Sequence, residues 1–287
     1  MVILVLKDGL GNQLFQYAAA RCLADKLKTD VGLDTSSFKF NPLREYSLHH
    51  FCIKERLLAG YERRFIRIKK RVKKVLKKLG LPGKEFSYYQ KGFHFDPGFF
   101  TLKNNVCIEG YWQSEKYFLP VSQIIREEFV VKPKPDEQNA LILSKIKSVE
   151  AVSLHVRRGD YVADPQVNAI HGVCSLSYYQ RAISYIKQKV KNPHFFIFSD
   201  DMEWVKENLV IEDSPVEYMT HNANKDYEDL RLMYSCRYNI TANSSFSWWG
   251  AWLNSHEEKI VVAPGNWVKE RYHNPDLLPD SWVRMEG

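Results

Sequence analysis

The sequence lacks the patterns that define several large classes of protein. Its five cysteines are scattered and form no C-x-x-C pair, which argues against a disulfide framework or a structural zinc site and favours a reducing compartment. No apolar run approaches the roughly 18 residues of a membrane-spanning helix. There is no D-x-D, no G-x-S-x-G and no cluster of His, Cys and Asp at metal-ligand spacing. A metal-bridged diphosphate and a serine hydrolase are therefore disfavoured.

The composition is that of an ordinary globular protein, long enough for two domains. Hydrophobic residues make up 45% and charged residues 26% of its 287 residues. The segment KPKPDE, residues 132–137, combines two prolines with charges of both signs and interrupts regular structure. We therefore expect an N-terminal domain of residues 1–135 and a C-terminal domain of residues 136–287.

Apolar periodicity predicts alternating strands and helices, which is typical of parallel sheets covered by helices. The apolar run at the N-terminus is short and lacks a basic region before it, so it predicts a strand rather than a signal peptide. The expected strands are 2–6, 31–33, 106–111, 151–156, 194–198, 238–242 and 259–263, and the expected helices are 13–27, 61–79, 176–190, 226–236 and 245–253. In open sheets of this kind, ligands bind at the carboxyl ends of strands. The loops after Leu6, Val156, Phe198 and Ala242 are therefore candidate binding sites.

The positive charge is concentrated in one candidate amphipathic helix. Residues 61–80 hold ten Lys or Arg and one Glu, a charge of +9, so the rest of the chain carries about −2 within the net charge of +7. The apolar residues of this segment recur at three- and four-residue spacing, at Phe65, Ile68, Val72, Val75 and Leu79. The pattern fits peripheral contact with an anionic membrane surface, and it also fits a helix that packs its apolar stripe on the N-terminal domain. Binding to nucleic acid is disfavoured, because no helix-turn-helix or RRM signature is present and aromatic residues do not interleave with the basic run.

The segment HVRRGDY, residues 155–161, follows a predicted strand directly. Guanidinium groups stay charged and match phosphate oxygens in pairs, so an arginine at this strand end could stabilise a departing diphosphate without a metal. The alternative is a surface salt bridge between Arg158 and Asp160. Because consecutive side chains on an extended segment point in opposite directions, we expect one of Arg157 and Arg158 to bind phosphate and the other to hold the loop.

Three further loops carry candidate binding residues. Ser244 and Ser245 begin the predicted helix of NSSFSWWGAWL, and a helix N-terminus attracts anions, although an ordinary capped helix with its tryptophans in the core would look the same. Asp200 of FSDD lies just past a strand end, where it could read ribose hydroxyls or cap the helix from Met202. The GLGNQ loop brings Asn12 close to a ligand or to another loop, but it lacks the full dinucleotide-binding spacing.

Five segments, GLGNQLFQYA, GYWQSEKYF, HVRRGDY, FSDD and NSSFSWWGAWL, span almost the whole chain. In this set and order, the sequence resembles the bacterial α-1,2-fucosyltransferases of glycosyltransferase family 11. The resemblance implies a GT-B fold, with two Rossmann-like domains facing across a cleft, the N-terminal one for the acceptor and the C-terminal one for the GDP-sugar. It also implies GDP-β-L-fucose as donor and inversion at the anomeric carbon, with no essential metal or other cofactor. The implied acceptor is the 2-hydroxyl of a terminal β-galactoside, in an oligosaccharide or a lipid-linked glycan.

The resemblance also assigns roles to single positions. Arg157 matches the arginine that contacts the donor β-phosphate, and His155 matches the histidine near the nucleotide. Arg158, which the resemblance does not assign, is a candidate for the donor site, although its position beside Arg157 favours a structural role. Asn12 matches an asparagine that lies near the phosphates and the acceptor. The start of the pyrophosphate-binding helix is matched by Ser244, Ser245 and Phe246.

Two roles depend on carboxylates. In the wider superfamily, an acidic residue 16 positions before the second serine reads the guanine, and that position is Asp229 here. Its carboxylate could accept from the guanine N1–H and amino group together, which adenine cannot offer. The resemblance does not assign the general base. Asp160 is our candidate, with Asp164 and His171 behind it, and the alternative for Asp160 is a salt bridge to an arginine.

The sequence therefore predicts a metal-independent, inverting fucosyltransferase in the cytoplasm, with peripheral contact at the inner face of the membrane through residues 61–80. Two alternatives stay open. One is a glycosyltransferase that uses another sugar nucleotide, and the other is a non-catalytic protein that binds glycans or nucleotides.

Overall fold

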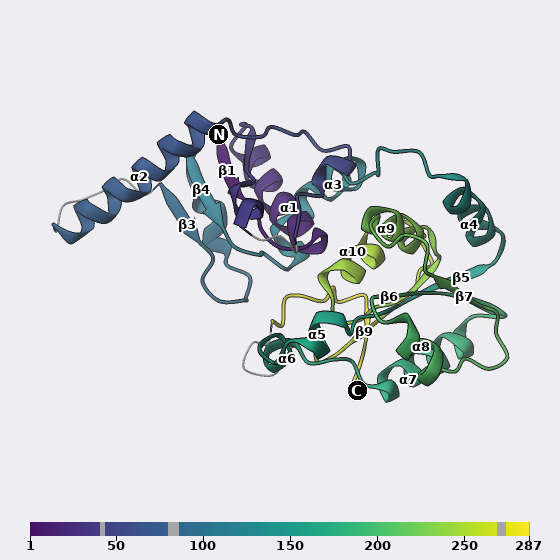
Figure 1. The fold of residues 1–287 in the computed structure, drawn as a ribbon. Coiled ribbons are helices and arrows are strands. Elements are labelled where there is room, and N and C mark those ends of the chain that lie inside the picture. The colour runs from purple at the N-terminus through teal and green to yellow at the C-terminus, as the bar shows by residue number, and fades with distance from the viewer. Residues whose placement is uncertain (41–43, 80–85, 269–273, 287) are drawn as a thin grey trace. The chain divides into compact units, whose positions relative to one another are not determined.

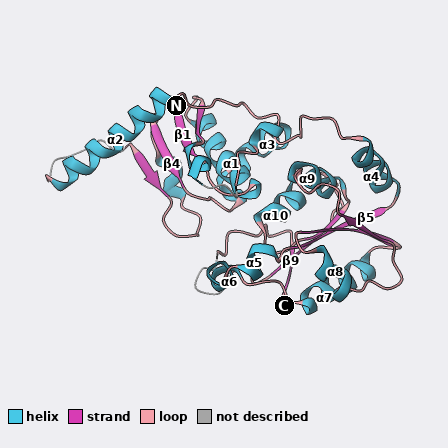
Figure 2. Cartoon of the chain, in the orientation of Figure 1, coloured by secondary structure: helices cyan, strands magenta, loops and turns pink. Residues whose placement is uncertain are grey.

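The computed structural model describes residues 1–40, 44–79, 86–268 and 274–286. Its contacts divide the chain into two units, Met1–Val130 and Val131–Gly287, and the division falls just before the KPKPDE segment. Each unit has its own parallel β-sheet with helices packed on it (Figures 1 and 2). The α/β class expected from the sequence is confirmed.

The N-terminal unit is built on a four-stranded parallel sheet in the order β2-β1-β4-β3. Its strands and α-helices are β1 (Val2–Val5), α1 (Leu10–Lys26), β2 (Val31–Asp34), α2 (Gly60–Lys78), β3 (Ser87–Tyr89), β4 (Val106–Glu109) and α3 (Ser122–Glu128). Short 3-10 helices lie between them, namely η1 (Ser36–Phe40), η2 (Leu48–His50), η3 (Pro97–Thr101), η4 (Glu115–Tyr117) and η5 (Leu119–Val121). Strand β1 pairs in parallel with β2 on one side and with β4 on the other. The point where the strand order reverses therefore lies between β1 and β4.

The C-terminal unit is built on a six-stranded parallel sheet in the order β10-β9-β8-β5-β6-β7. Its elements are α4 (Glu137–Ser148), β5 (Glu150–Val156), α5 (Gly159–Ala163), α6 (Pro165–His171), α7 (Leu176–Lys189), β6 (Pro193–Ser199), α8 (Met202–Asn208), β7 (Val216–Met219), α9 (Asp226–Ser235), β8 (Tyr238–Ile240), α10 (Ser245–Leu253), β9 (Val261–Pro264) and β10 (Val283–Met285). From β5 the chain builds outward through β6 and β7, and it then returns to place β8 on the other side of β5. The strand order thus reverses between β5 and β8, where a ligand is expected.

Strand β6 is buried on both faces of this sheet. Phe195 and Ile197 pack in a core with α7 and α8, whereas Phe196 and Phe198 pack in a second core with α4 and α9. Successive side chains of a strand point to opposite faces, so a strand covered by helices on both sides needs apolar residues at nearly every position. This requirement explains the run FFIF.

Helix α10 lies close against α9 because Gly250 has no side chain. A Cβ atom built at Gly250 would lie 2.9 Å from the Cβ atom of Met233. The tryptophans of α10 point into the core, as the sequence interpretation favoured, with exposed fractions of 0% for Trp248 and Trp249 and 4% for Trp252. The indole Nε1 of Trp248 donates a hydrogen bond to a backbone carbonyl at 2.9 Å, so its polar atom is satisfied.

Helix α2 forms over the predicted residues, but its apolar stripe does not pack on its own unit. The residues of the apolar stripe are Phe65, Ile68, Val72, Val75 and Leu79, and between 48% and 66% of each is exposed. The helix is attached by another face, where Ile66 is 4% exposed and packs with Ile3, Leu58 and Cys107. At about 100° per residue, the stripe lies on nearly the opposite side of the helix from Ile66. The interpretation that the stripe packs on the N-terminal domain was therefore wrong, and Figure 1 shows α2 extending beyond the strands.

Other differences concern the bounds of strands, short elements and the 12-residue helix α4, which was not predicted. Strand β8 ends two residues earlier than expected, and β9 begins two residues later. The short strands β3, β7 and β10 and several short helices were not predicted, because three or four residues give too little periodicity to recognise. Ser114 caps the 3-10 helix η4, since its side chain accepts a hydrogen bond from the backbone N–H of Lys116. Within the described ranges, no helix is both long and apolar enough to cross a membrane.

Replacing Gly250 with Ala is expected to destabilise the C-terminal unit, because the added Cβ must displace the Met233 Cβ, which the helix backbone fixes. We expect a loss of about 1–3 kcal/mol in the free energy of unfolding, measured with denaturant. The matched control is Gly60→Ala in the first turn of α2, where an added Cβ meets nothing within 4 Å. Equal effects of the two substitutions would contradict the close contact of α9 and α10.

Candidate functional site

The carboxylate of Asp200, after β6, holds the segment that follows β5. Arg157 Nη1 lies 2.9 Å from Asp200 Oδ2, and the backbone N–H of Arg158 donates to Asp200 Oδ1 at 2.8 Å. The guanidinium of Arg158 turns toward α8, where its Nε lies 3.1 Å from Asp201 Oδ2 and its Cζ lies 3.9 Å from the ring centroid of Trp204. The two arginines thus have different partners, and which of them binds phosphate stays a prediction.

The glycine of HVRRGDY is needed for this arrangement. A Cβ atom at Gly159 would lie 2.6 Å from Asp200 Oδ2, so a larger residue would push that carboxylate away. Beyond the glycine, the ring centroid of Tyr161 lies 5.5 Å from Arg157 Cζ, and its hydroxyl donates to the carbonyl oxygen of Asn243 at 3.2 Å. Tyr161 therefore connects the arginine segment with the loop that begins α10.

The acidic residues near this segment have roles that the sequence left open. Asp201, rather than Asp200, caps α8, and Arg158 pairs with Asp201. Asp164 accepts a hydrogen bond from the backbone N–H of Gln166 at 2.8 Å, at the start of α6. The two remaining candidates for the base, Asp160 and His171, have side chains outside the described part of the structure.

His155 is buried at the end of β5, with 6% of the residue exposed. Its ring centroid lies 5.7 Å from that of Phe246 in the first turn of α10. The pKa of His155 is lowered to about 4, mainly by burial, with a smaller lowering by the positive charge of Arg157 and an opposing effect of Asp200. Among the described residues, its Nδ1 has no hydrogen-bond partner. The imidazole is therefore neutral at pH 7 and can offer a nitrogen to a ligand.

The start of α10 lies at the reversal point of the sheet. The Ser244 side chain caps the helix by accepting a hydrogen bond from the backbone N–H of Phe246 at 3.3 Å. Asn243, before it, donates to the carbonyl oxygens of Gly172 and Trp267, which fixes the loop. Ser245 is half-buried as the first helical residue. The helix N-terminus thus presents a positive dipole end beside the segment of Arg157.

Asp229 lies on α9 and is held by a chain of amides. Its Oδ1 accepts from Asn222 Nδ2 at 2.8 Å, and the Oδ1 of Asn222 accepts from Asn139 Nδ2 at 3.0 Å. Burial raises the pKa of Asp229 to about 7, which the hydrogen bond from Asn222 opposes. A ligand that supplies additional hydrogen-bond donors would favour the ionised form of this carboxylate over the protonated form.

A second group of polar residues lies at the reversal point of the N-terminal sheet. Asn12 Oδ1 accepts from Gln113 Nε2 at 2.8 Å, so the GLGNQ and GYWQSEKYF segments meet. The Tyr111 hydroxyl donates to Asp8 Oδ2 at 2.7 Å, and Asp8 has a φ angle of 65°, in the left-handed region. Asn12 was predicted from the sequence, but Asp8, Tyr111 and Gln113 were not. Their position just after β1 and β4 was the signal that could have found them.

The polar residues at the reversal points of the two sheets suit different parts of a reaction. In the C-terminal unit, a fixed guanidinium, a helix N-terminus and a neutral imidazole can bind a diphosphate and stabilise it as it leaves. The polar side chains of the N-terminal unit can bind hydroxyl groups. The part of the chain that the structure describes contains no group of three or more His, Cys, Asp or Glu that could hold a metal ion.

The fold and these groups define a glycosyltransferase of the GT-B type. The family model of "Glycosyl transferase family 11" matches residues 1–286, so the chain belongs to this family and is an enzyme. It is 35% identical to an alpha-1,2-colitosyltransferase of Escherichia coli over 100% of this chain and 99% of that protein. It is 33% identical to the O-antigen biosynthesis glycosyltransferase WbnK of Escherichia coli, over 98% and 99% of the two chains.

More distant proteins also match over most of the chain. The galactoside 2-alpha-L-fucosyltransferase of Caenorhabditis elegans is 27% identical over 99% of this chain and 79% of its own length. Among solved structures, the GDP complex of a FUT1 mutant from Arabidopsis thaliana has a TM-score of 0.53, with 12% identity over 98% of this chain and 75% of that one. This likeness confirms the fold that the sequence predicted.

Asp229→Asn is expected to stabilise the protein more as the pH rises. The pKa of Asp229 is about 7 in the folded chain, against 3.8 for an ordinary Asp, so the folded state holds an extra proton between these values. The contribution of Asp229 to the stability of the wild type should therefore be most favourable below about pH 4 and fall until about pH 7. Asn stays neutral, so the difference in Tm between variant and wild type should grow over this range and level off above it. Thermal melts across the range measure this, and a constant difference would contradict the raised pKa.

Proposed function

We propose that the enzyme is an inverting α-1,2-fucosyltransferase, which moves L-fucose from GDP-β-L-fucose to the 2-hydroxyl of a terminal β-galactoside in a glycan. The observation that carries this proposal is the position of Arg157, oriented by Asp200 and next to the start of α10, where the strand order reverses. The name of the colitosyltransferase relative supports an α-1,2 linkage, and that of the Caenorhabditis elegans relative supports fucose and a galactoside.

The proposed reaction is a single displacement. The acceptor hydroxyl oxygen attacks the anomeric carbon of fucose from the face opposite GDP, while the bond between that carbon and the β-phosphate oxygen breaks. The electron pair leaves with the diphosphate, and Arg157 and the N-terminus of α10 stabilise the added charge. A general base takes the hydroxyl proton, with the carboxylate of Asp160 as the candidate and Asp164 and His171 behind it. No part of this scheme requires a metal.

The remaining candidates bind the nucleotide or the acceptor. In this proposal the C-terminal unit binds GDP-fucose, with His155, Ser244, Ser245 and Phe246 at the diphosphate side and Asp229 at the guanine. Ionised Asp229 would accept two hydrogen bonds from the guanine edge. Asp200 acts mainly by orienting Arg157, because both of its oxygens are engaged by the arginine segment. Asn12 belongs to the acceptor side, in the N-terminal unit.

A second candidate function is transfer of another sugar from a GDP-sugar. The 35% identity to an alpha-1,2-colitosyltransferase over the full chain favours colitose as the alternative. Colitose is fucose without the 3-hydroxyl group, so the nucleotide-binding residues would serve either donor. Turnover with GDP-fucose and GDP-colitose separates the two, and calorimetry with GDP, UDP and CDP tests the nucleotide.

Arg157→Ala is expected to lower kcat for transfer from GDP-fucose to galactose-terminated oligosaccharides by about 10²–10³-fold, because the leaving diphosphate loses its fixed cation. The fold should be kept, which the thermal melt checks. Arg284→Ala is the matched control, since Arg284 lies in the C-terminal unit and contacts the exposed Asp280. Near-normal turnover of Arg157→Ala would refute the phosphate role. No transfer by the wild type from any GDP-sugar would refute the function.

We further propose that α2 lies on an anionic membrane surface, at the inner face of the membrane. Three observations support this contact: the apolar stripe is exposed, basic residues border it, and the helix is attached to its unit by the opposite face through Ile66. Interfacial helices combine these features, since the apolar side enters the lipid boundary while cations meet the anionic head groups.

Removing two apolar side chains from the stripe tests this contact. Phe65→Ser combined with Val72→Ser should weaken binding to phosphatidylglycerol vesicles by about tenfold or more, because less apolar area enters the bilayer. Leu141→Ser combined with Val210→Ser is the matched control, as both residues are exposed and apolar but lie in the C-terminal unit. Flotation or sedimentation with vesicles measures the binding. Equal binding by the two double variants would refute the membrane contact.

A further inference from the structure

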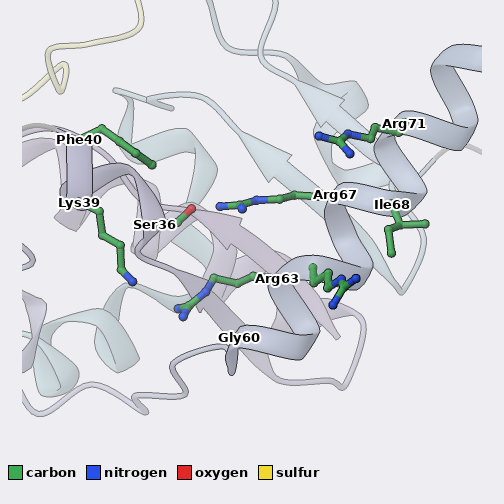
Figure 3. Close-up of a pocket in the computed structure, with 9 residues that line it drawn as sticks. Ser36, Lys39, Phe40, Gly60, Arg63, Arg67, Ile68 and Arg71 are labelled. Atoms are coloured by element: carbon green, nitrogen blue, oxygen red, sulfur yellow. The ribbon is translucent and has the colours of Figure 1, made fainter.

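A surface pocket of about 620 Å³ lies between α2 and η1, and its lining is strongly basic. The polar residues that line it are Ser36, Lys39, Arg63, Arg64, Arg67 and Arg71. In Figure 3, Arg63 and Arg67 extend from α2 toward η1, where Ser36 and Lys39 lie. We call this feature the arginine pocket. The pocket belongs wholly to the N-terminal unit, and none of the residues proposed above for GDP-fucose lines it.

Among the described residues, no acidic side chain pairs with the cations of the arginine pocket. Within the described residues, the side chains of its arginines and of Lys39 form no ion pair and no hydrogen bond. The only acidic residue of α2 is Glu62, and its carboxylate is engaged by Arg56 at 2.9 Å and by the backbone N–H of Ala59 at 2.9 Å. Like charges four residues apart on a helix repel and destabilise it. A row of arginines in this state is suited to an anion from outside the chain.

The spacing of the arginines indicates the size of that anion. Arg63, Arg67 and Arg71 follow one another at four-residue intervals, which places them about 6 Å apart along the helix axis and about 12 Å from first to last. Guanidinium groups bind phosphate oxygens in pairs, and the row is longer than one phosphate group can contact. A diphosphate fits the row better than a single phosphate does.

One residue connects the arginine pocket with the apolar stripe. Ile68 lines the pocket, and it is also a member of the stripe, with 48% of the residue exposed. A ligand that placed its anionic group among the arginines could therefore lay an apolar part along Ile68 and the rest of the stripe. We propose that the arginine pocket binds the diphosphate of a lipid whose hydrocarbon chain lies in the membrane beside the apolar stripe. This inference rests on the proposed membrane contact of α2.

Vesicle binding with two matched pairs of substitutions tests the proposal. Phosphatidylcholine vesicles would carry either a polyprenyl diphosphate or phosphatidylglycerol at equal surface charge, with GDP present to occupy the donor site. The wild type should bind the diphosphate vesicles about tenfold or more tightly than the phosphatidylglycerol vesicles. Arg63→Gln with Arg67→Gln should remove this preference. Lys69→Gln with Lys78→Gln removes the same charge from α2 outside the pocket, so it should weaken binding to both kinds of vesicle by the same factor and keep the preference.

Each other outcome overturns a defined part of the proposal. Equal loss of preference in both double variants would show general electrostatic attraction instead of a site. If inorganic pyrophosphate displaced the protein from the diphosphate vesicles as well as farnesyl diphosphate did, the pocket would be a site for a free anion. Binding to phosphatidylglycerol vesicles without a preference for the diphosphate would refute the pocket and leave the membrane contact intact. Fucosyl transfer to a soluble acceptor, which should be unchanged by Arg63→Gln with Arg67→Gln, tests the transferase function separately.

Discussion

The carboxylate of Asp200 determines the geometry of the C-terminal site, because it joins the ends of two neighbouring parallel strands. Its two oxygens engage the Arg157 guanidinium after β5 and the backbone N–H of Arg158, and the absent side chain of Gly159 makes room for it. A long arginine side chain in open solvent would lose rotamer entropy on binding a phosphate. Here much of that ordering is already present in the unliganded chain, with Arg157 and Asp200 both about three-quarters buried. In the proposed reaction, Asp200 would thus contribute to binding of the diphosphate through Arg157.

The sequence could predict where this site lies but not how its acidic residues divide their roles. Strand periodicity and the rule for strand ends place HVRRGDY, FSDD and the start of α10 at one edge, since all of them follow parallel strands. The two aspartates of FSDD are adjacent, and no local pattern shows which one caps α8 and which one turns back toward Arg157. That choice depends on the approach allowed by Gly159, which is 41 residues away in the chain. The pKa of Asp229 could not be predicted either, because burial is a property of the folded unit.

Helix α2 shows a related limit of amphipathic patterns. The spacing of its apolar residues correctly predicts a helix with an apolar stripe. The same spacing is expected whether the stripe packs on the protein itself or contacts another partner. The protein uses the opposite face, where a single buried Ile66 and the Lys70 side chain, 3.8 Å from Glu109, attach the helix to the sheet. The helix continues beyond the sheet, and its apolar stripe is exposed.

Asp229 is expected to lower the stability of the protein at neutral pH and to favour the binding of guanine. A buried aspartate with a pKa of about 7 lowers the stability of the unliganded protein at neutral pH, because part of the population must bury a charge. An asparagine would avoid that cost, but it has one acceptor oxygen where the carboxylate has two, so it cannot accept from the N1–H and the amino group of guanine in parallel. If GDP provides those donors, its binding must lower the pKa of Asp229, so protons are released when GDP binds. Because binding releases protons, the affinity for the nucleotide must rise with pH. The unfavourable burial in the empty site and the preference for guanine are then two consequences of the same carboxylate.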